Sequence, residues 1–167
     1  KTTADKVSDD FIRSRIAKAY PNHGILSEEN EEIKGKNNYK WVFDPLDGTI
    51  GFVSGDRHWC TAIAVADGPY PVAAAIYRPL LNEMFIAEAG QGTYVNDTLV
   101  KAPVTTTKAS KAILGSDNGL FPDNRRMLQI LDKLYQKDGA TYVQTTACAT
   151  DQMLRVIKGK LDGYVSA

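Results

Sequence analysis

The sequence predicts a layered α+β domain. Helical patterns near both ends of the chain enclose a central stretch in which apolar runs alternate with turn residues. The strands of that stretch follow one another without helices between them, which argues against a simple strand–helix–strand alternation. At 167 residues the chain has the length of one domain, for which about 100–200 residues is usual.

Three segments are predicted to be helices. Apolar residues recur at three- and four-residue spacing over Lys6–Tyr20, which indicates an amphipathic helix. Thr2–Asp5 matches the S/T-x-x-D/E capping box with which helices begin. Asp123–Lys137 places its apolar residues on one face, and a third helix is expected over Thr150–Lys158.

Strands are predicted where short runs of apolar and β-branched residues end at turn residues. The first ends at the turn formed by Pro45 and Gly48, and two later runs form a hairpin around Gly90 and Gly92. The expected strands are Trp41–Phe43, Trp59–Ala66, Val72–Tyr77, Glu83–Glu88, Thr93–Val95 and Leu161–Val165.

Composition excludes several classes of protein. The 20 basic and 20 acidic side chains give a formal net charge of zero, which argues against a nucleic-acid polymer as partner. No apolar run approaches the ~20 residues that span a bilayer, so no membrane association is expected. Two cysteines, Cys60 and Cys148, do not indicate a disulfide framework and favour a reducing, cytoplasmic location.

The densest group of chemical side chains is Asp44-Pro45-Leu46-Asp47-Gly48-Thr49. Two carboxylates three residues apart, across a turn that proline fixes, can converge on one point. Carboxylate oxygens suit Mg²⁺, which usually keeps waters and substrate phosphate oxygens as its other ligands. The backbone N–H groups after Gly48 suit an anion. The alternative is an ordinary turn in which both aspartates cap local amides.

Two weaker acidic signals lie upstream. Glu28 and Glu29 are adjacent carboxylates, and a bound divalent ion would relieve their repulsion. The alternative is a solvated acidic surface, because further glutamates follow them. For Asp5 the default interpretation is the cap of the first helix, because Thr2–Asp5 matches the capping box.

The order of these motifs along the chain resembles that of the inositol monophosphatase family. Thr3–Asp5, Pro21–Glu29 and the sequence Trp41–Thr49 each match a family motif. Further on, the hairpin E-x-F-x-A-x-x-G-x-G and the segment Lys158–Tyr164 also match. The resemblance implies the layered αβαβα sugar-phosphatase fold shared with fructose-1,6-bisphosphatases, incomplete in this chain.

The resemblance also implies a metal site. Glu28 and Asp44, with the backbone carbonyl of Leu46, would hold one Mg²⁺ ion. Asp44 would bridge to a second ion that Asp47 also binds, and the family uses two or three ions in all.

The family further implies how substrate and water are held. Gly48 and Thr49 would bind phosphate through backbone N–H groups, while Asp5 and Thr49 would orient and deprotonate the attacking water. Ala147 and Cys148 lie where relatives have a stretch facing the substrate. For Cys148, a small buried filler is the alternative.

One family motif is missing. The sequence contains no W-D-x-x-A-G, whose aspartate completes the second metal site in the family. Asp162 matches a separate structural aspartate. We therefore expect residues 1–167 to be the N-terminal and central portion of a single, longer phosphatase domain.

The leading functional hypothesis is a Mg²⁺-dependent phosphomonoesterase that hydrolyses a small sugar or polyol phosphate, such as inositol monophosphate, and the family implies a homodimer. Within the same class, 3′-phosphoadenosine 5′-phosphate, histidinol phosphate or fructose 1,6-bisphosphate are alternative substrates. From another class, a non-catalytic metal- or phosphate-binding module is the alternative.

Overall fold

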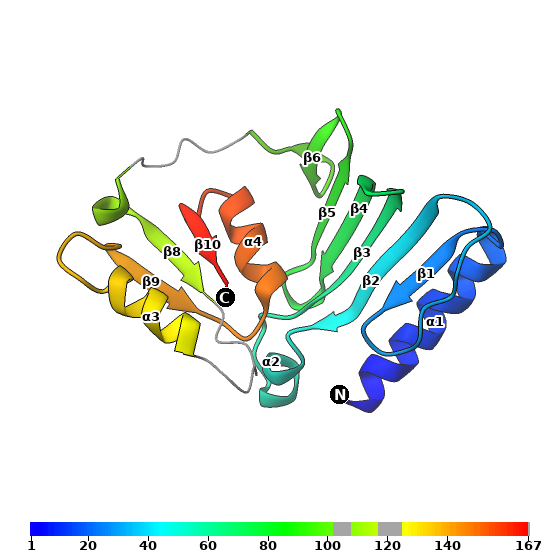
Figure 1. Cartoon of the computed structure of the whole chain (residues 1–167), viewed down its shortest axis with the longest axis horizontal. Helices are drawn as coiled ribbons and strands as arrows, with labels where there is room; N and C mark the ends of the chain where they lie inside the picture. The colour runs from blue at the N-terminus through cyan, green and yellow to red at the C-terminus, as the bar shows by residue number, and fades with distance from the viewer. Residues whose placement is uncertain (102–107, 117–124, 167) are drawn as a thin grey trace. The chain divides into compact units, whose positions relative to one another are not determined.

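The computed structural model describes residues 1–101, 108–116 and 125–166. They form two compact units, Lys1–Val100 and Lys101–Ala167 (Figure 1). Each unit combines a sheet with helices, so the predicted α+β class is confirmed. None of the helices in the described ranges is long and apolar enough to cross a membrane.

The first unit is built on a seven-stranded mixed sheet whose strands lie in chain order. β1 pairs in parallel with β2, and every later neighbour is antiparallel. Helix α1 (Thr3–Ala19) packs on β1 and β2, and the short α2 (Thr49–Ser54) follows β2. The strands are β1 (Gly24–Ser27), β2 (Tyr39–Asp47), β3 (Cys60–Asp67), β4 (Tyr70–Arg78), β5 (Glu83–Glu88), β6 (Gly92–Val95) and β7 (Thr98–Leu99). A 3₁₀ turn, η1 (Pro79–Leu81), joins β4 to β5.

Helix α1 begins with the predicted capping box. The Thr2 hydroxyl accepts hydrogen bonds from the N–H groups of Ala4 and Asp5, at 3.2 and 3.4 Å. In return, Asp5 Oδ2 accepts one from the N–H of Thr2 at 2.6 Å. Three N–H groups at the helix start are thus satisfied by side chains, those of Thr2 and Asp5 reciprocally.

The prediction of one apolar buried face is wrong for the first half of α1. Val7 and Phe11 are 62% and 64% exposed, while Asp5 and Asp9 are fully buried. The helix side that faces the end of β1 therefore carries carboxylates. Hydrogen bonds to both oxygens of Asp5 and to Oδ2 of Asp9 offset the lost hydration, whereas Oδ1 of Asp9 is buried without a hydrogen-bond partner among the described residues.

The apolar core lies under the second half of α1. Ile16 packs there with Ile25 of β1 and Phe43 of β2. Partly buried side chains extend this cluster, namely Ile12, Trp41 and Ile63. The central strands are thereby fixed against the helix, and their ends become a rigid support for polar groups.

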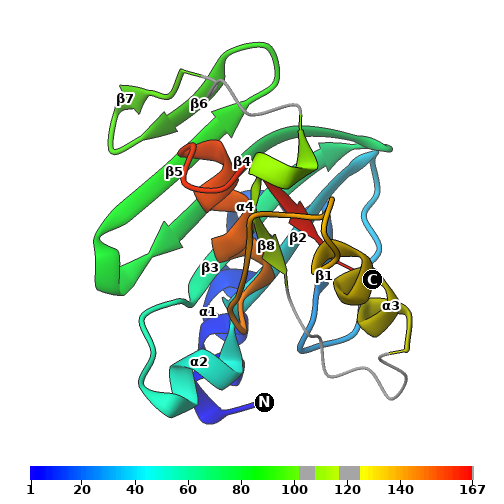
Figure 2. The ribbon, with the colours of Figure 1, turned by 90° about the vertical axis from the view of Figure 1, so that its left-hand side faces the viewer.

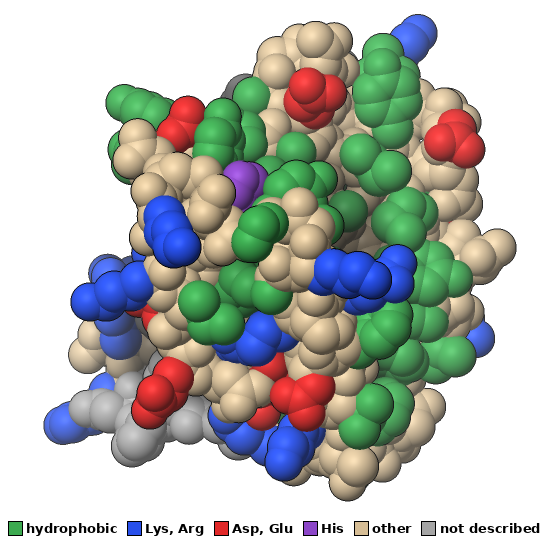
Figure 3. All heavy atoms as spheres, turned by 90° about the vertical axis from the view of Figure 1, so that its right-hand side faces the viewer, with side chains coloured by type: hydrophobic (Ala, Val, Ile, Leu, Met, Phe, Trp, Pro, Cys, Tyr) green, Lys and Arg blue, Asp and Glu red, His purple; other side chains and the backbone are tan. Residues whose placement is uncertain are grey.

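An apolar stretch of the same sheet face continues beyond α1. Ile63 of the core pairs in register with Ala75, and Ala75 with Ile86. Ile86 then pairs with Tyr94, so all these side chains share one face. Ile86 and Tyr94 remain 48% and 37% exposed. Figure 3 shows hydrophobic side chains, coloured green, gathered toward the right of the molecular surface that faces the viewer.

Strand β2 is longer than predicted. It runs through Pro45 to Asp47, and the register against β3 shifts between Asp44 and Asp47. Proline has no N–H to give to a ladder, so it is tolerated where the register breaks. The carbonyl of Pro45 still accepts a hydrogen bond from the Thr61 hydroxyl at 2.9 Å. Pro45 thus lies in a bulge-like irregularity within the strand, and the predicted turn comes only at Gly48.

The second unit contains a three-stranded parallel sheet in the order β10-β8-β9. Its elements are η2 (Ala109–Lys111), β8 (Ile113–Ser116), α3 (Arg125–Leu134), β9 (Tyr142–Thr145), α4 (Ala149–Ile157) and β10 (Gly163–Val165). Strands and helices alternate, so the expectation of no such alternation is wrong for this unit. The predicted start of α3 at Asp123 lies outside the described residues. Asp162 accepts a hydrogen bond from the N–H of Ile113 at 2.8 Å, in keeping with its expected structural role.

The contribution of ionised Asp9 to the stability of the fold can be tested by mutation. Burial alone would raise its pKa, but hydrogen bonds from Ser27, Asn30 and Arg13, with the Arg13 charge, hold the pKa below its usual 3.8. Ionised Asp9 therefore stabilises the fold above that value, and the stabilisation is lost as pH falls through the folded pKa. We expect Asp9→Asn to lower the free energy of unfolding by about 1.5–3 kcal/mol at neutral pH.

The measurement is urea denaturation from pH 7 to about pH 3. The difference between Asp9→Asn and the wild-type protein should shrink below about pH 4, because Asp9 then becomes protonated. Asp10→Asn, an exposed neighbour on α1, is the control and should change little. A deficit in Asp9→Asn that stays constant over this pH range would contradict the assignment.

Candidate functional site

Glu28 and Asp44 are brought together by the pairing of β1 with β2. The parallel register sets Ser27 beside Phe43 at the end of β1. The next residue on each strand is therefore Glu28 or Asp44, so the two carboxylates leave the sheet at neighbouring points. The Glu28 side chain lies close enough to Asp44 to raise its pKa, both by its negative charge and by a hydrogen bond that requires a proton on one of the two carboxyl groups. The two predicted metal ligands, 16 positions apart in the sequence, thus lie in contact.

Asp47 joins them because of the register shift in β2. In a regular strand, residues three apart point to opposite faces of the sheet. The shift between Asp44 and Asp47 removes that alternation, and the negative charge of Asp47 acts on Asp44. Asp47 therefore lies near enough to act on the Glu28–Asp44 pair, and we call Glu28, Asp44 and Asp47 the acidic cluster. Among the described residues, these three do not form a group whose ligand atoms all lie within 4.8 Å of one another, so their joint binding of a metal stays a prediction.

Asp44 has a strongly perturbed pKa. Burial raises it to about 7, assisted by the negative charges of Asp47 and Glu28 and against a hydrogen bond from the N–H of Leu46. That hydrogen bond is 2.9 Å long. Within the described residues, no lysine or arginine forms a salt bridge with Asp44.

The acidic cluster fits a hard divalent cation. Three carboxylates with a shared excess of negative charge are stabilised by such an ion, and oxygen donors are what Mg²⁺ prefers. The Leu46 carbonyl lies 3.2 Å from the Thr49 hydroxyl oxygen, whose single proton it shares with the Asp5 carboxylate described below. The Leu46 carbonyl therefore lies beside the acidic cluster, where β2 ends and α2 begins. We call this region the corner.

Asp5 reaches the corner from α1. Its Oδ1 accepts a hydrogen bond from the Thr49 hydroxyl at 3.1 Å, while Oδ2 is held by Thr2. Figures 1 and 2 accordingly show α2 beside the first turn of α1. Burial would raise the pKa of Asp5, but the hydrogen bonds from Thr2 and Thr49 outweigh it and lower the pKa. Asp5 is thus both a helix cap and an ionised partner of Thr49.

Gly48 forms the turn between β2 and α2. It is buried and has a φ of 90°, a left-handed conformation that glycine adopts without strain. Its backbone begins α2, whose first N–H groups are at Thr49 and the residues after it. The predicted phosphate-binding pair thus lies directly after the acidic cluster in the chain.

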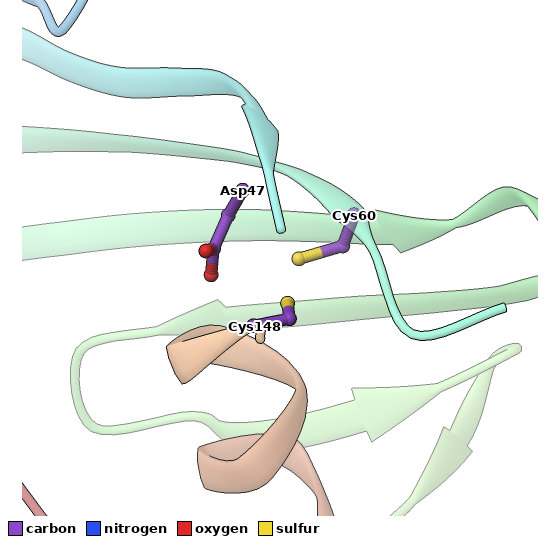
Figure 4. Close-up of side chains that lie close together, drawn as sticks. All are labelled: Asp47, Cys60 and Cys148. Carbon is purple, nitrogen blue, oxygen red and sulfur yellow. The ribbon is translucent and has the colours of Figure 1, made fainter. Parts of the chain in front are cut away.

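Cys60 is a neighbour of the site that the sequence analysis did not place there. It opens β3 as the register partner of Asp47 and is fully buried. In Figure 4 its sulfur and the Asp47 carboxylate extend into the same space. The antiparallel pairing of β2 with β3 could have placed Cys60 beside Asp47. That prediction requires the exact register of the two strands, which the sequence does not reveal.

Ala147 and Cys148 belong to the second unit and are described within it. Ala147 is exposed, whereas Cys148 is fully buried at the start of α4 (Figure 4). The Cys148 sulfur accepts a hydrogen bond from the N–H of Asp151 at 3.3 Å. Cys148 therefore caps α4, and its expected contact with substrate stays a prediction.

The cluster predicts a distinctive response to Asp44→Asn in the full-length protein. Without added metal, we expect the thermal midpoint to stay equal or rise, because one repelling carboxylate is gone. Added Mg²⁺ should raise the midpoint of the wild-type protein, by an amount equivalent to about 2.7 kcal/mol at 100 times its Kd. It should not raise that of Asp44→Asn.

Thermal unfolding with EDTA and with a series of MgCl₂ concentrations measures both effects. Asp10→Asn removes a carboxylate from an exposed position of α1 and should respond to Mg²⁺ as the wild-type protein does. An equal Mg²⁺ response in Asp44→Asn would show that Asp44 does not bind the ion.

Comparison with known proteins agrees with this geometry. All of residues 1–167 match the model of the inositol monophosphatase family. The chain is 29% identical to an inositol-1-monophosphatase of Rhizobium meliloti, over 96% of this chain and 60% of that protein. It is 32% identical to the Nus factor SuhB of Escherichia coli K12, over 98% of this chain and 61% of that protein. It therefore spans about three fifths of the length of these relatives.

A solved structure shows the same fold. The crystal structure of the extragenic suppressor protein SuhB of Bartonella henselae superposes with a TM-score of 0.90 at 27% identity. The match covers 99% of this chain and 65% of that one. The chain therefore belongs to the inositol monophosphatase family.

Proposed function

We propose that the full-length protein is a Mg²⁺-dependent phosphomonoesterase acting on a small sugar or polyol phosphate, such as inositol monophosphate. The observation that carries the proposal is the contact of Glu28 with Asp44 beside Asp47, next to the Asp5–Thr49 pair. Family membership over the whole chain supports it, as does the relative named inositol-1-monophosphatase.

The proposed metal ligands follow the acidic cluster. Glu28, Asp44 and the carbonyl of Leu46 would hold one Mg²⁺ ion. Asp44 and Asp47 would hold a second, within the family total of two or three. When bound, such ions polarise phosphoryl oxygens and make water a nucleophile near neutral pH.

Asp5 and Thr49 are proposed to act on the attacking water. Because the pKa of Asp5 is lowered, its carboxylate is ionised at neutral pH. Oδ1 accepts from the Thr49 hydroxyl, so Thr49 can in turn accept a hydrogen bond from water. This pair orients the water and gives its proton an acceptor, while Oδ2 keeps the carboxylate fixed to Thr2.

The proposed phosphate contacts are the backbone N–H groups of Gly48 and Thr49. They suit this role because Gly48 has no side chain to obstruct an anion, and because helix-start N–H groups point outward. Ala147 and Cys148 are proposed to face the substrate, with exposed Ala147 as the better contact.

Three finer expectations accompany this proposal. A homodimer and a single longer phosphatase domain, of which residues 1–167 are part, rest on the family, and a cytoplasmic location rests on the two cysteines. Since the chain spans about three fifths of its relatives, activity is to be measured in the full-length protein.

Phosphate release tests the proposal. The substrates are inositol monophosphate, fructose 1,6-bisphosphate, histidinol phosphate and 3′-phosphoadenosine 5′-phosphate, each with Mg²⁺ and with EDTA. We expect Mg²⁺-dependent release from one or two of them, abolished in Asp44→Asn. A relative named Nus factor keeps the binding-module alternative open. Mg²⁺ binding without release from any substrate would favour that alternative.

Asp5 allows catalysis to be separated from helix capping. Asp5→Asn should lower kcat by at least about 100-fold, because a poor proton acceptor replaces the carboxylate. Thr2→Ala removes the capping hydroxyl but keeps the Asp5 carboxylate. It should cost about 1 kcal/mol of stability with kcat changed only a few-fold.

Steady-state kinetics and urea denaturation of both variants decide the matter. If Asp5→Asn only destabilises the protein, as Thr2→Ala does, Asp5 is a cap and nothing more. A large loss of kcat in Thr2→Ala would instead make the capping box itself essential for turnover.

A further inference from the structure

We propose that Asp9 and Arg13 of α1 are positioning residues that hold Glu28 against Asp44. The inference rests on the proposed metal site and adds two residues to it that touch neither metal nor substrate. The two residues act through the segment Ser27–Glu31, which follows β1 and contains Glu28.

Arg13 donates hydrogen bonds in three directions. Its Nε reaches Asp9 Oδ2 at 3.2 Å, and its Nη2 reaches the Ser27 hydroxyl at 2.6 Å. Its Nη1 donates to the backbone carbonyl of Glu31 at 3.2 Å. The Asp9 side chain is fully buried and that of Arg13 is 14% exposed. A guanidinium, with its fixed planar fork, suits three acceptors at fixed places, whereas an ammonium does not.

Asp9 extends the network to a further residue of the segment. The same Oδ2 accepts a hydrogen bond from Asn30 Nδ2 at 2.5 Å. We call Asp9, Arg13, Ser27, Asn30 and the Glu31 carbonyl the α1 network. It fastens the chain to α1 on both sides of Glu28, at Ser27 before it and at Asn30 and Glu31 after it.

Glu28 requires such fastening. It is itself exposed, and it lies against Asp44, whose charge is of the same sign. When both carboxylates are ionised and no cation is bound, they repel each other, and an exposed segment would move away from the sheet to relieve that repulsion. The α1 network opposes this movement, so the ligand is in place before the ion arrives. Preorganisation of this kind raises affinity by lowering the cost of ordering.

The experiment measures Mg²⁺ binding to the metal-stripped full-length protein by titration calorimetry, without substrate. Arg13→Ala should weaken the Kd for Mg²⁺ by about 10–100-fold, the usual loss when a partner behind a metal ligand is removed. Arg13→Lys should give an intermediate loss. The direction is diagnostic, since removing a positive charge near the site would by electrostatics alone tighten cation binding.

Arg15→Ala is the matched control. It removes the same charge from an exposed position of α1, where the guanidinium lies 5.9 Å from the Phe11 ring centre. Its Kd for Mg²⁺ should stay within about twofold of the wild-type value. At saturating Mg²⁺, the kcat of Arg13→Lys should recover to near the wild-type level, because the network acts on ligand placement and not on the chemical step.

Each outcome is decisive. If Arg13→Ala does not fold, as judged by circular dichroism and thermal unfolding, then Arg13→Lys and Asn30→Ala carry the test. Folded variants that bind Mg²⁺ as tightly as the wild-type protein would overturn the positioning role alone. A wild-type protein that binds no Mg²⁺ would overturn the proposed metal site together with this inference. Because the titration needs no turnover, an unidentified substrate leaves its result intact.

Discussion

Mutual repulsion among Glu28, Asp44 and Asp47 is the interaction on which the rest of the first unit depends. Three acidic side chains at one corner repel one another and destabilise a fold, so they stay together only where the backbone holds them there. Here two separate backbone features do so: the parallel pairing of β1 with β2, and the register shift at Pro45. The raised pKa of Asp44 is the direct consequence. The charge imbalance therefore comes from the fold and not from a chance arrangement of surface side chains.

Helix α1 handles its own acidic residues differently. Asp9 is neutralised within the protein by Arg13 and hydrogen-bonded by Asn30. Asp5 divides its two oxygens between the cap at Thr2 and the hydroxyl of Thr49. Both have lowered pKa values, whereas that of Asp44 is raised. One unit thus contains carboxylates whose ionised form is stabilised by protein partners beside a cluster that is suited to an external cation.

Much of this could be predicted from local sequence signals. The capping box, the strands of the antiparallel meander and the acidic motif depend on neighbouring residues, which periodicity and turn chemistry reveal. The missed features depend on pairing between distant segments. Strand β2 continues through Pro45 because β3 still supports its carbonyl through Thr61. The buried side of the first half of α1 is polar because Asn30 and Ser27 lie opposite Asp9. In the second unit, β8 and β9 are four residues each, too short for a periodic signal.

The two kinds of carboxylate indicate how stability and function are separated in this fold. The α1 network pairs the charges of Asp9 and Arg13 with each other, so it can hold the end of β1 whether or not a cation is present. The acidic cluster is strained by its own charge, and its relief depends on what binds there. Because the network binds residues on both sides of Glu28, it opposes a displacement of that segment that would relieve the repulsion. The repulsion therefore persists in the metal-free protein, and its relief adds to the free energy of cation binding.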